Sequence, residues 1–219
     1  MNSQIKKINL NHSFIFFLFC NIFSVIVFKF TNLDISTLFC FLLILTIGVS
    51  HGALDHLKGK KLLTILNIKK FYIFYLIYIL LALSVILVWT IVPAITLIVF
   101  LAVASFHFGK EDTQFLINKS SNLTSILYFF RGLLIIIAPM YFNFDETVTI
   151  FKMLLIDSKQ FYSSLGCIEK YKIIEIAIGL STLSSIILFL SEFNIKKFAI
   201  FLDFLSIIIL NYYLSPLVA

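Results

Sequence analysis

Long apolar runs alternate with short polar segments along almost the whole chain. About 20 apolar residues cross a bilayer as a helix, and these runs lack the alternation of polar and apolar positions that marks barrel strands. Because lipid offers the backbone no hydrogen bonds, the runs predict helices. We expect seven membrane-spanning helices, at Ser13–Phe30, Ile35–His51, Phe71–Trp89, Pro93–Phe108, Leu123–Phe142, Tyr171–Glu192 and Phe198–Leu214.

The segments between these runs do not divide the chain into modules. No linker rich in Gly, Ser or Pro and no internal repeat interrupts it. The segment Asp145–Lys170 is less apolar, and we expect it to be a loop with a short interfacial helix. No small-residue cleavage site follows the first run, so we expect a retained helix rather than a signal peptide. The predicted fold is all-α, a polytopic transmembrane helix bundle that forms a single integral membrane domain over residues 1–219.

Composition strengthens this prediction and excludes a soluble globule. Hydrophobic residues make up 61% of the chain and charged residues 13%, whereas a soluble domain has roughly half apolar and about a quarter charged residues. The formal net charge of +6 raises the question of nucleic acid. Here the basic residues lie between apolar runs and form no stripe with interleaved aromatics, so we expect no nucleic-acid partner.

The lysines of the connections predict an orientation in the membrane. If the N-terminus is cytoplasmic, the cytoplasmic side carries Lys6, Lys7, Lys58, Lys60, Lys61, Lys69, Lys70, Lys110, Lys119, Lys196 and Lys197. The other side then carries Lys29, Lys152, Lys159 and Lys170. We therefore predict a multi-pass protein of the cell inner membrane with a cytoplasmic N-terminus.

Two histidines lie near the ends of predicted helices that run in the same direction. His51 ends the second helix and His107 the fourth, each beside a glycine that permits close helix approach, so we expect both at one depth near the cytoplasmic face. Imidazole suits zinc, copper or iron. Asp55 follows His51 by four residues and could hold its second nitrogen, whereas His56 lies about 140° around the helix. The alternative is that the histidines simply face headgroups and water.

Other polar residues have weaker signals. Arg131 lies well inside the fifth helix and needs a partner or a polar cavity, with Glu175 and Asp203 as candidates unless these snorkel. Tyr72, Tyr75 and Tyr78 form either a packing or interfacial stripe or part of a ligand wall, with packing favoured. We find no phosphate-binding loop, no GxSxG, no CxxC and no dinucleotide fingerprint, so the chemistries of soluble enzymes have little support.

Several segments together resemble a known family. Ser50-His51-Gly52-Ala53-Leu54-Asp55-His56 and Ser105-Phe106-His107-Phe108-Gly109-Lys110-Glu111-Asp112 are similar to signature segments of the Brp/Blh-type β-carotene 15,15′-dioxygenases. Arg131-Gly132-Leu133-Leu134, with Pro139 and Asp145-Glu146-Thr147 after it, resembles the next segment, and Leu214-Ser215-Pro216-Leu217-Val218-Ala219 resembles the start of the last motif-bearing helix. The resemblance runs from about the second helix to the final residue.

The resemblance implies an iron(II)-dependent dioxygenase of the inner membrane. Its substrates would be β-carotene and O₂, its products two molecules of retinal, and its partners membrane lipid and, through retinal, an opsin. His51 and His107 match two Fe²⁺ ligands, Asp55 would support them, and Asp112 could make a helix-end contact. We expect no catalytic residue beyond the metal ligands.

The match to the family pattern stops before the remaining histidine ligands, which the family takes from a later helix. An eighth helix would begin at Ser215-Pro216, and at about 1.5 Å per residue its side chains would reach the depth of His107 after about 13 residues. We expect the chain to be a C-terminally truncated form, with the other ligands beyond Ala219 and little cleavage activity by itself.

Two other functions fit the same residues. A non-catalytic protein that binds carotenoid or retinal for opsin biogenesis would use the same motifs without metal. A small transporter would line a polar pathway with His51, His107 and Arg131, but the first, third and seventh helices offer few polar residues for it.

Overall fold

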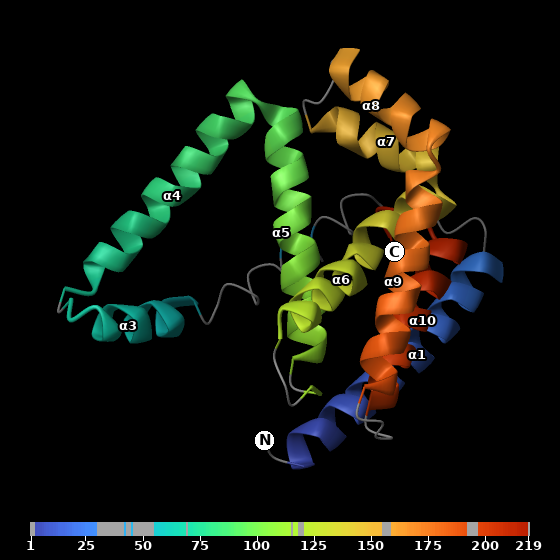
Figure 1. Cartoon of the computed structure of the whole chain (residues 1–219), viewed down its shortest axis with the longest axis horizontal. Helices are drawn as coiled ribbons and strands as arrows, with labels where there is room; N and C mark the ends of the chain where they lie inside the picture. Colours follow the sequence, from blue (N-terminus) through green and yellow to red (C-terminus); the bar gives the residue numbers. More distant parts are fainter. Residues whose placement is uncertain are drawn as a thin grey trace. The chain divides into compact units, whose positions relative to one another are not determined.

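The computed structural model describes residues 3–29, 42, 45, 55–68, 70–114, 116–117, 121–154, 159–191 and 197–218. All regular secondary structure within these ranges is helical (Figure 1). The helices are α1 (Ser3–Lys29), α3 (Asp55–Ile65), α4 (Tyr72–Ile91), α5 (Pro93–Thr113), α6 (Asn122–Phe142), α7 (Phe144–Met153), α8 (Lys159–Lys170), α9 (Ile173–Leu190) and α10 (Phe198–Tyr213).

The predicted all-α fold is confirmed. Within the described ranges, α1, α4, α5, α6 and α9 are long and apolar enough to cross a membrane, and α10 is a shorter apolar helix. These six correspond to six of the seven predicted spans. The remaining one, Ile35–His51, lies outside the described residues except for Leu42 and Leu45, which are both helical.

Three predicted bounds differ from the structure by more than a few residues. The first span was expected to begin at Ser13, but α1 already begins at Ser3. The fourth span was expected to end at Phe108, but α5 continues to Thr113, where the Thr113 hydroxyl donates to the Gly109 carbonyl at 2.5 Å. Polar residues such as Lys110 and Glu111 mark the limit of the apolar run and are still good helix formers. The segment Asp145–Lys170, expected to hold one short helix, contains most of α7 and all of α8.

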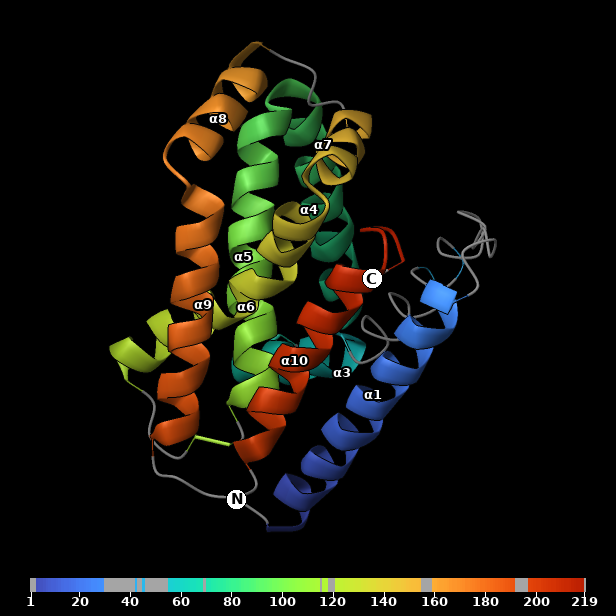
Figure 2. The same ribbon diagram turned by 90° about the vertical axis from the view of Figure 1, so that its right-hand side faces the viewer.

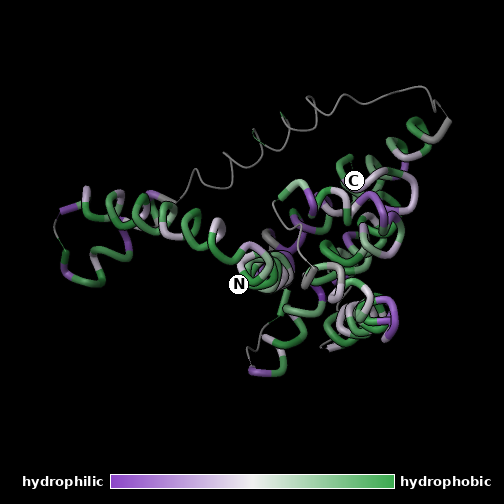
Figure 3. The backbone as a smooth tube through the Cα atoms, turned by 90° about the horizontal axis from the view of Figure 1, so that it is seen from above, coloured by the Kyte–Doolittle hydropathy of each residue, from purple (hydrophilic) through white to green (hydrophobic). Residues whose placement is uncertain are grey.

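Contacts divide the chain into two units, and each is described by itself. The larger unit holds residues 1–33 and 97–219, and the smaller unit holds residues 34–96. The expected single domain stays a prediction. In both units hydrophobic residues predominate along the helices, and many of the hydrophilic residues lie at helix ends and connections (Figure 3).

The larger unit is built around two helix pairs. α6 packs against α9, α1 runs along α10, and α10 also contacts α6 and α9 (Figure 2). Small side chains on α9 allow the close approach, since Ser181, Ser184 and Ser185 are all buried. The Ser184 hydroxyl donates to the Leu127 carbonyl of α6 at 2.6 Å, which fixes the two helices in register.

Polar groups also hold the ends of these helices. The Asn143 amide, just after α6, donates to the carbonyls of Asn211 at 3.0 Å and Leu214 at 3.1 Å, at the end of α10. Lys197 is buried, and its ammonium donates to the carbonyls of Leu188 and Ser191 at the end of α9. A cation suits this place because the last carbonyls of a helix carry partial negative charge. Lys197 thereby ties the end of α9 to the start of α10.

The smaller unit consists mainly of α3 and α4. α3 ends in a Schellman motif: Asn67 adopts φ 57°, its N–H donates to Thr64, and the Ile68 N–H donates to Leu63. Asparagine tolerates this left-handed conformation better than most residues. Gly59 of α3 lies directly against the Phe74 ring of α4, so the turn brings the two helices together.

Candidate functional site

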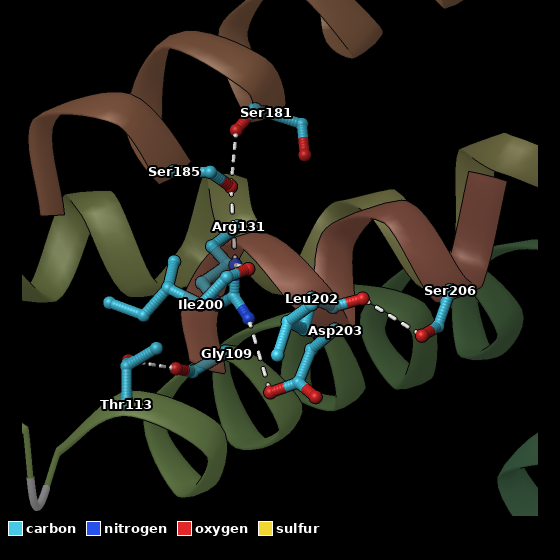
Figure 4. A network of polar contacts seen from close by, with 9 residues as sticks. All are labelled: Gly109, Thr113, Arg131, Ser181, Ser185, Ile200, Leu202, Asp203 and Ser206. Carbon is cyan, nitrogen blue, oxygen red and sulfur yellow. Dashed lines mark hydrogen bonds and ion pairs between the residues drawn. The ribbon is translucent and has the colours of Figure 1, made fainter. Parts of the chain in front are cut away.

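A buried arginine lies at the centre of the larger unit. Arg131 on α6 has only 4% of its surface exposed. Its Nη1 donates to the Ser185 hydroxyl of α9 at 3.3 Å and to the Ile200 carbonyl of α10 at 3.1 Å. Its Nη2 lies 3.9 Å from the Asp203 carboxylate of α10 (Figure 4). One guanidinium therefore joins three helices.

Arg131 was expected to need a partner, and the structure identifies Asp203 rather than Glu175 as that partner. Glu175 begins α9 with an exposed side chain and lines a separate recess with Met140 and Tyr141. Asp203 has 23% of its side chain exposed and interacts with Ser13 of α1. The cluster thus reaches a fourth helix.

A second carboxylate acts on the same arginine from α5. Asp112, in the last turn of α5, interacts electrostatically with Arg131, as does Asp203. A buried charge needs such compensation, because desolvation in an apolar bundle is costly. The arginine Nε remains without a hydrogen-bond partner within the described residues. We name Arg131, Asp112 and Asp203 the charge cluster.

The charge cluster depends on a very close crossing of α5 and α6. A Cβ added to Gly109 would collide with the Tyr128 carbonyl, and a Cβ added to Gly132 would collide with the Ser105 carbonyl. The two backbones are therefore in direct contact. Gly132 is next to Arg131 and Gly109 is three residues before Asp112, so the contact sets the separation of the two charges.

His107 lies on α5 one helical turn before Glu111. Its Nε2 is 3.5 Å from a Glu111 carboxylate oxygen, and about half of each side chain is exposed, 51% and 45%. The charges of His107 and Glu111 both act on Asp112. The last turns of α5 therefore present an exposed imidazole–carboxylate pair and also contribute Asp112 to the charge cluster.

The other predicted site residues belong to the smaller unit or lie outside the description. His51 is outside the described residues, Asp55 is the first residue of α3, and His56 is exposed on α3. The pairing of His51 with His107 and the supporting role of Asp55 therefore stay predictions. No group of three His, Cys, Asp or Glu side chains that could hold a metal occurs in the described ranges.

The donors that the described residues do offer are compatible with ferrous iron. Imidazole nitrogen and carboxylate oxygen are the ligand types of non-haem iron(II) centres with open positions. Of these, His107 offers an exposed imidazole nitrogen, and the Glu111 carboxylate lies 3.5 Å from its Nε2, where it could orient the ring.

Three features of this region were not found from the sequence. Glu111 follows His107 by four residues, and residues four apart share a helix face, so this pair could have been predicted from the sequence. Ser181 and Ser185 have the small-xxx-small spacing of close helix packing. The contact between Gly109 and Gly132 had no such signal, because it depends on how two separate helices cross.

The surroundings of the α4 tyrosines favour a packing or interfacial stripe over a ligand wall. Tyr72, Tyr75 and Tyr78 are 61%, 47% and 50% exposed, respectively. The Tyr75 ring contacts the rings of Phe71 and Phe74, and the Tyr78 ring contacts Phe74. These contacts lie along α4 and its start, as expected of a packing stripe.

Comparison with known proteins gives one match. No curated protein and no solved structure matches the chain. The family model of beta-carotene 15,15′-dioxygenase matches residues 42–219. The matched region includes both histidine segments, the α5–α6 crossing and the charge cluster, and it covers most of the chain. The chain therefore belongs to the beta-carotene 15,15′-dioxygenase family.

Proposed function

We propose that this protein cleaves β-carotene at its central double bond with O₂, giving two molecules of retinal. The observation that carries the proposal is the family match, which extends over both histidine segments. One double bond is broken, and one O₂ supplies the oxygen atoms of the two aldehydes. We propose Fe²⁺ as the cofactor, with His51 and His107 among its ligands and Asp55 supporting them.

Several described residues would have specific roles in this reaction. When bound, ferrous iron would supply the means of activating O₂. His107 presents its ring near the end of α5, and the carboxylate of Glu111, 3.5 Å away, would hold that ring in orientation. The crossing at Gly109 and Gly132 fixes this part of α5 against α6.

The apolar helices suit a hydrocarbon substrate. β-Carotene partitions into lipid, so it would reach the site laterally, and retinal would leave by the same route. Large hydrophobic side chains are exposed along α4 and α5, including Leu80, Leu87, Ile95 and Phe100. Such surfaces would hold the polyene and keep water away from reactive oxygen species.

The test is co-expression in cells that accumulate β-carotene. The full-length protein is expressed in such cells, beside cells that carry an empty vector. We expect it to consume β-carotene and to produce retinal, measured by liquid chromatography, and to bind iron after purification. If it leaves β-carotene intact and binds no iron, the proposal fails.

A histidine control tests the ligand assignment. His107→Ala should abolish retinal formation and lower the iron content, whereas His56→Ala should leave both close to the parent values. Equal activity of the His107→Ala variant and its parent would refute the assignment. Uncleaved carotenoid that copurifies with an iron-free protein would instead identify a binding protein.

A further inference from the structure

A groove lies beside the basic turn that joins α3 to α4. It has a volume of about 700 Å³. Its polar lining comes from His56, Lys60, Thr64 and Asn67. Its apolar lining includes Leu63, Ile68 and Phe71. In the Schellman motif the Ile68 N–H donates to the Leu63 carbonyl, and both residues line the groove. The fold of the turn therefore shapes the groove.

The surroundings of the groove are strongly positive. Lys58, Lys60, Lys61, Lys69 and Lys70 lie within one short stretch of sequence, and Asp55 is the one acidic residue between Asp34 and Glu111. The side chains of Lys60, Lys61 and Lys70 are exposed. The ion pairs found between described residues, His107–Glu111 and Arg131–Asp203, involve none of these lysines. The groove therefore favours an anion.

The same segment is apolar enough to lie at a membrane surface. Leu57, Leu62 and Ile65 of α3 are 53%, 52% and 69% exposed. α4, which follows directly, is long and apolar enough to span a membrane and has no buried residue. A helix with lysines and exposed leucines beside such a span fits the headgroup layer, where tyrosines such as Tyr72 are also enriched.

We propose that the groove between α3 and the α3–α4 turn binds an anionic phospholipid. The Lys60 ammonium and the Asn67 amide would donate to the lipid phosphate, and Lys61 and Lys70 would add to its attraction. The glycerol and the first part of an acyl chain would pack on Leu63, Ile68 and Phe71 and continue along α4. This site is independent of the proposed carotenoid cleavage.

The test is native mass spectrometry of the full chain in a neutral detergent. Phosphatidylglycerol and phosphatidylcholine with identical acyl chains are titrated in parallel. We expect tighter binding of phosphatidylglycerol, and the variant Lys60→Gln/Lys61→Gln/Lys70→Gln should lose about fivefold in affinity for each lysine that contacts the headgroup. The matched variant Lys110→Gln/Lys152→Gln/Lys170→Gln removes the same charge elsewhere and should bind as the parent does.

A second pair of variants separates a bound lipid from general surface attraction. Thr64→Trp would fill the groove without changing charge and should abolish the preference for phosphatidylglycerol. Thr90→Trp is its control, since both threonines are exposed on their helices and donate to a carbonyl of their own helix.

Four results would overturn the proposal. They are equal affinity for the two lipids, an effect of the control lysine variant as large as that of the groove variant, no effect of Thr64→Trp, and displacement of phosphatidylglycerol by inorganic phosphate. The last result would identify a site for free anions instead of lipid.

Discussion

At the scale of single residues, Arg131 is a buried charge inside the apolar bundle, as Lys197 is at the end of α9. Its guanidinium donates to a hydroxyl of α9 and a carbonyl of α10, and the carboxylates of Asp203 on α10 and Asp112 on α5 compensate its charge. Removal of one partner leaves a buried charge without compensation. The loss of folding stability is then larger than the net contribution of the intact pair. The charge cluster is therefore sensitive to single substitutions.

We predict that Arg131→Met lowers the stability of the detergent-solubilised chain by about 3–5 kcal/mol, because Asp203 and Asp112 lose their cation. The measurement is thermal or denaturant unfolding followed by circular dichroism. The double variant Arg131→Met/Asp203→Asn should recover part of the loss. A double variant that is as unstable as the sum of its parts would show that the pair is not coupled.

Asp203→Asn is expected to destabilise the chain, whereas Glu175→Gln should change its stability by less than about 0.5 kcal/mol, as is usual for exposed positions. Both acids were candidate partners of Arg131 in the sequence, and only Asp203 contacts it. The pair of unfolding curves is therefore a matched comparison. A larger effect from Glu175→Gln would contradict the observed pairing.

Glu111 gives a further prediction that rests on the proposed function. Removal of a group that orients a metal-bound histidine typically lowers metal affinity by about 10- to 100-fold, so Glu111→Gln should weaken iron binding in that range. Glu146→Gln, an exposed acid on α7, is the control. Iron affinity is measured by titration of the apoprotein, and an unchanged value would exclude Glu111 as the orienting group.

At the scale of elements, α5 and α6 meet backbone to backbone at Gly109 and Gly132. Gly109→Ala and Gly132→Ala each place a methyl group against a backbone carbonyl that cannot turn away as a side chain could. We expect each variant to separate the helices and to unfold at a clearly lower temperature. The same separation should move His107 and lower the proposed cleavage activity.

Two other glycines provide the control for this prediction. A Cβ added at Gly166 of α8 or Gly179 of α9 meets nothing within 4 Å. Because alanine favours a helix over glycine by up to about 1 kcal/mol, Gly166→Ala and Gly179→Ala should be neutral or stabilising. Destabilisation by all four substitutions would show that the crossing has no special role.

The elements also show where reasoning from sequence succeeds in this chain. Apolar length alone located six helices, because a spanning helix needs a long apolar run and little else. It ended the fourth span at Phe108, since Lys110 and Glu111 end the apolar run without ending the helix. The need of Arg131 for a partner was predictable, but the choice of Asp203 over Glu175 and the contact of Gly109 with Gly132 depend on tertiary packing.

At the scale of the larger unit, the directions of the helices agree with the predicted crossing pattern. Ser105 faces Gly132 and Gly109 faces Tyr128, so α5 and α6 are antiparallel. Arg131 contacts Ile200 and Asn143 contacts Asn211, so α6 and α10 are parallel. α1 also runs parallel to α10 (Figure 2). The end of α9 therefore lies on the same side as the start of α1, and α8 lies on the other side.

This arrangement makes the proposed orientation testable with thiol labels. Cys167 on α8 is a free, exposed cysteine. With a cytoplasmic N-terminus, α8 faces away from the cytoplasm, so a membrane-impermeant maleimide should label Cys167 on spheroplasts, in a variant that carries Cys40→Ser. Ser191→Cys, placed at the end of α9 in a chain that also carries Cys40→Ser and Cys167→Ser, should be labelled only after the membrane is opened. The reverse pattern would place the N-terminus on the side of the membrane away from the cytoplasm and would contradict the proposed orientation. Equal labelling of both positions before lysis would contradict the helix directions themselves, since the two cysteines could then not lie on opposite sides of the membrane.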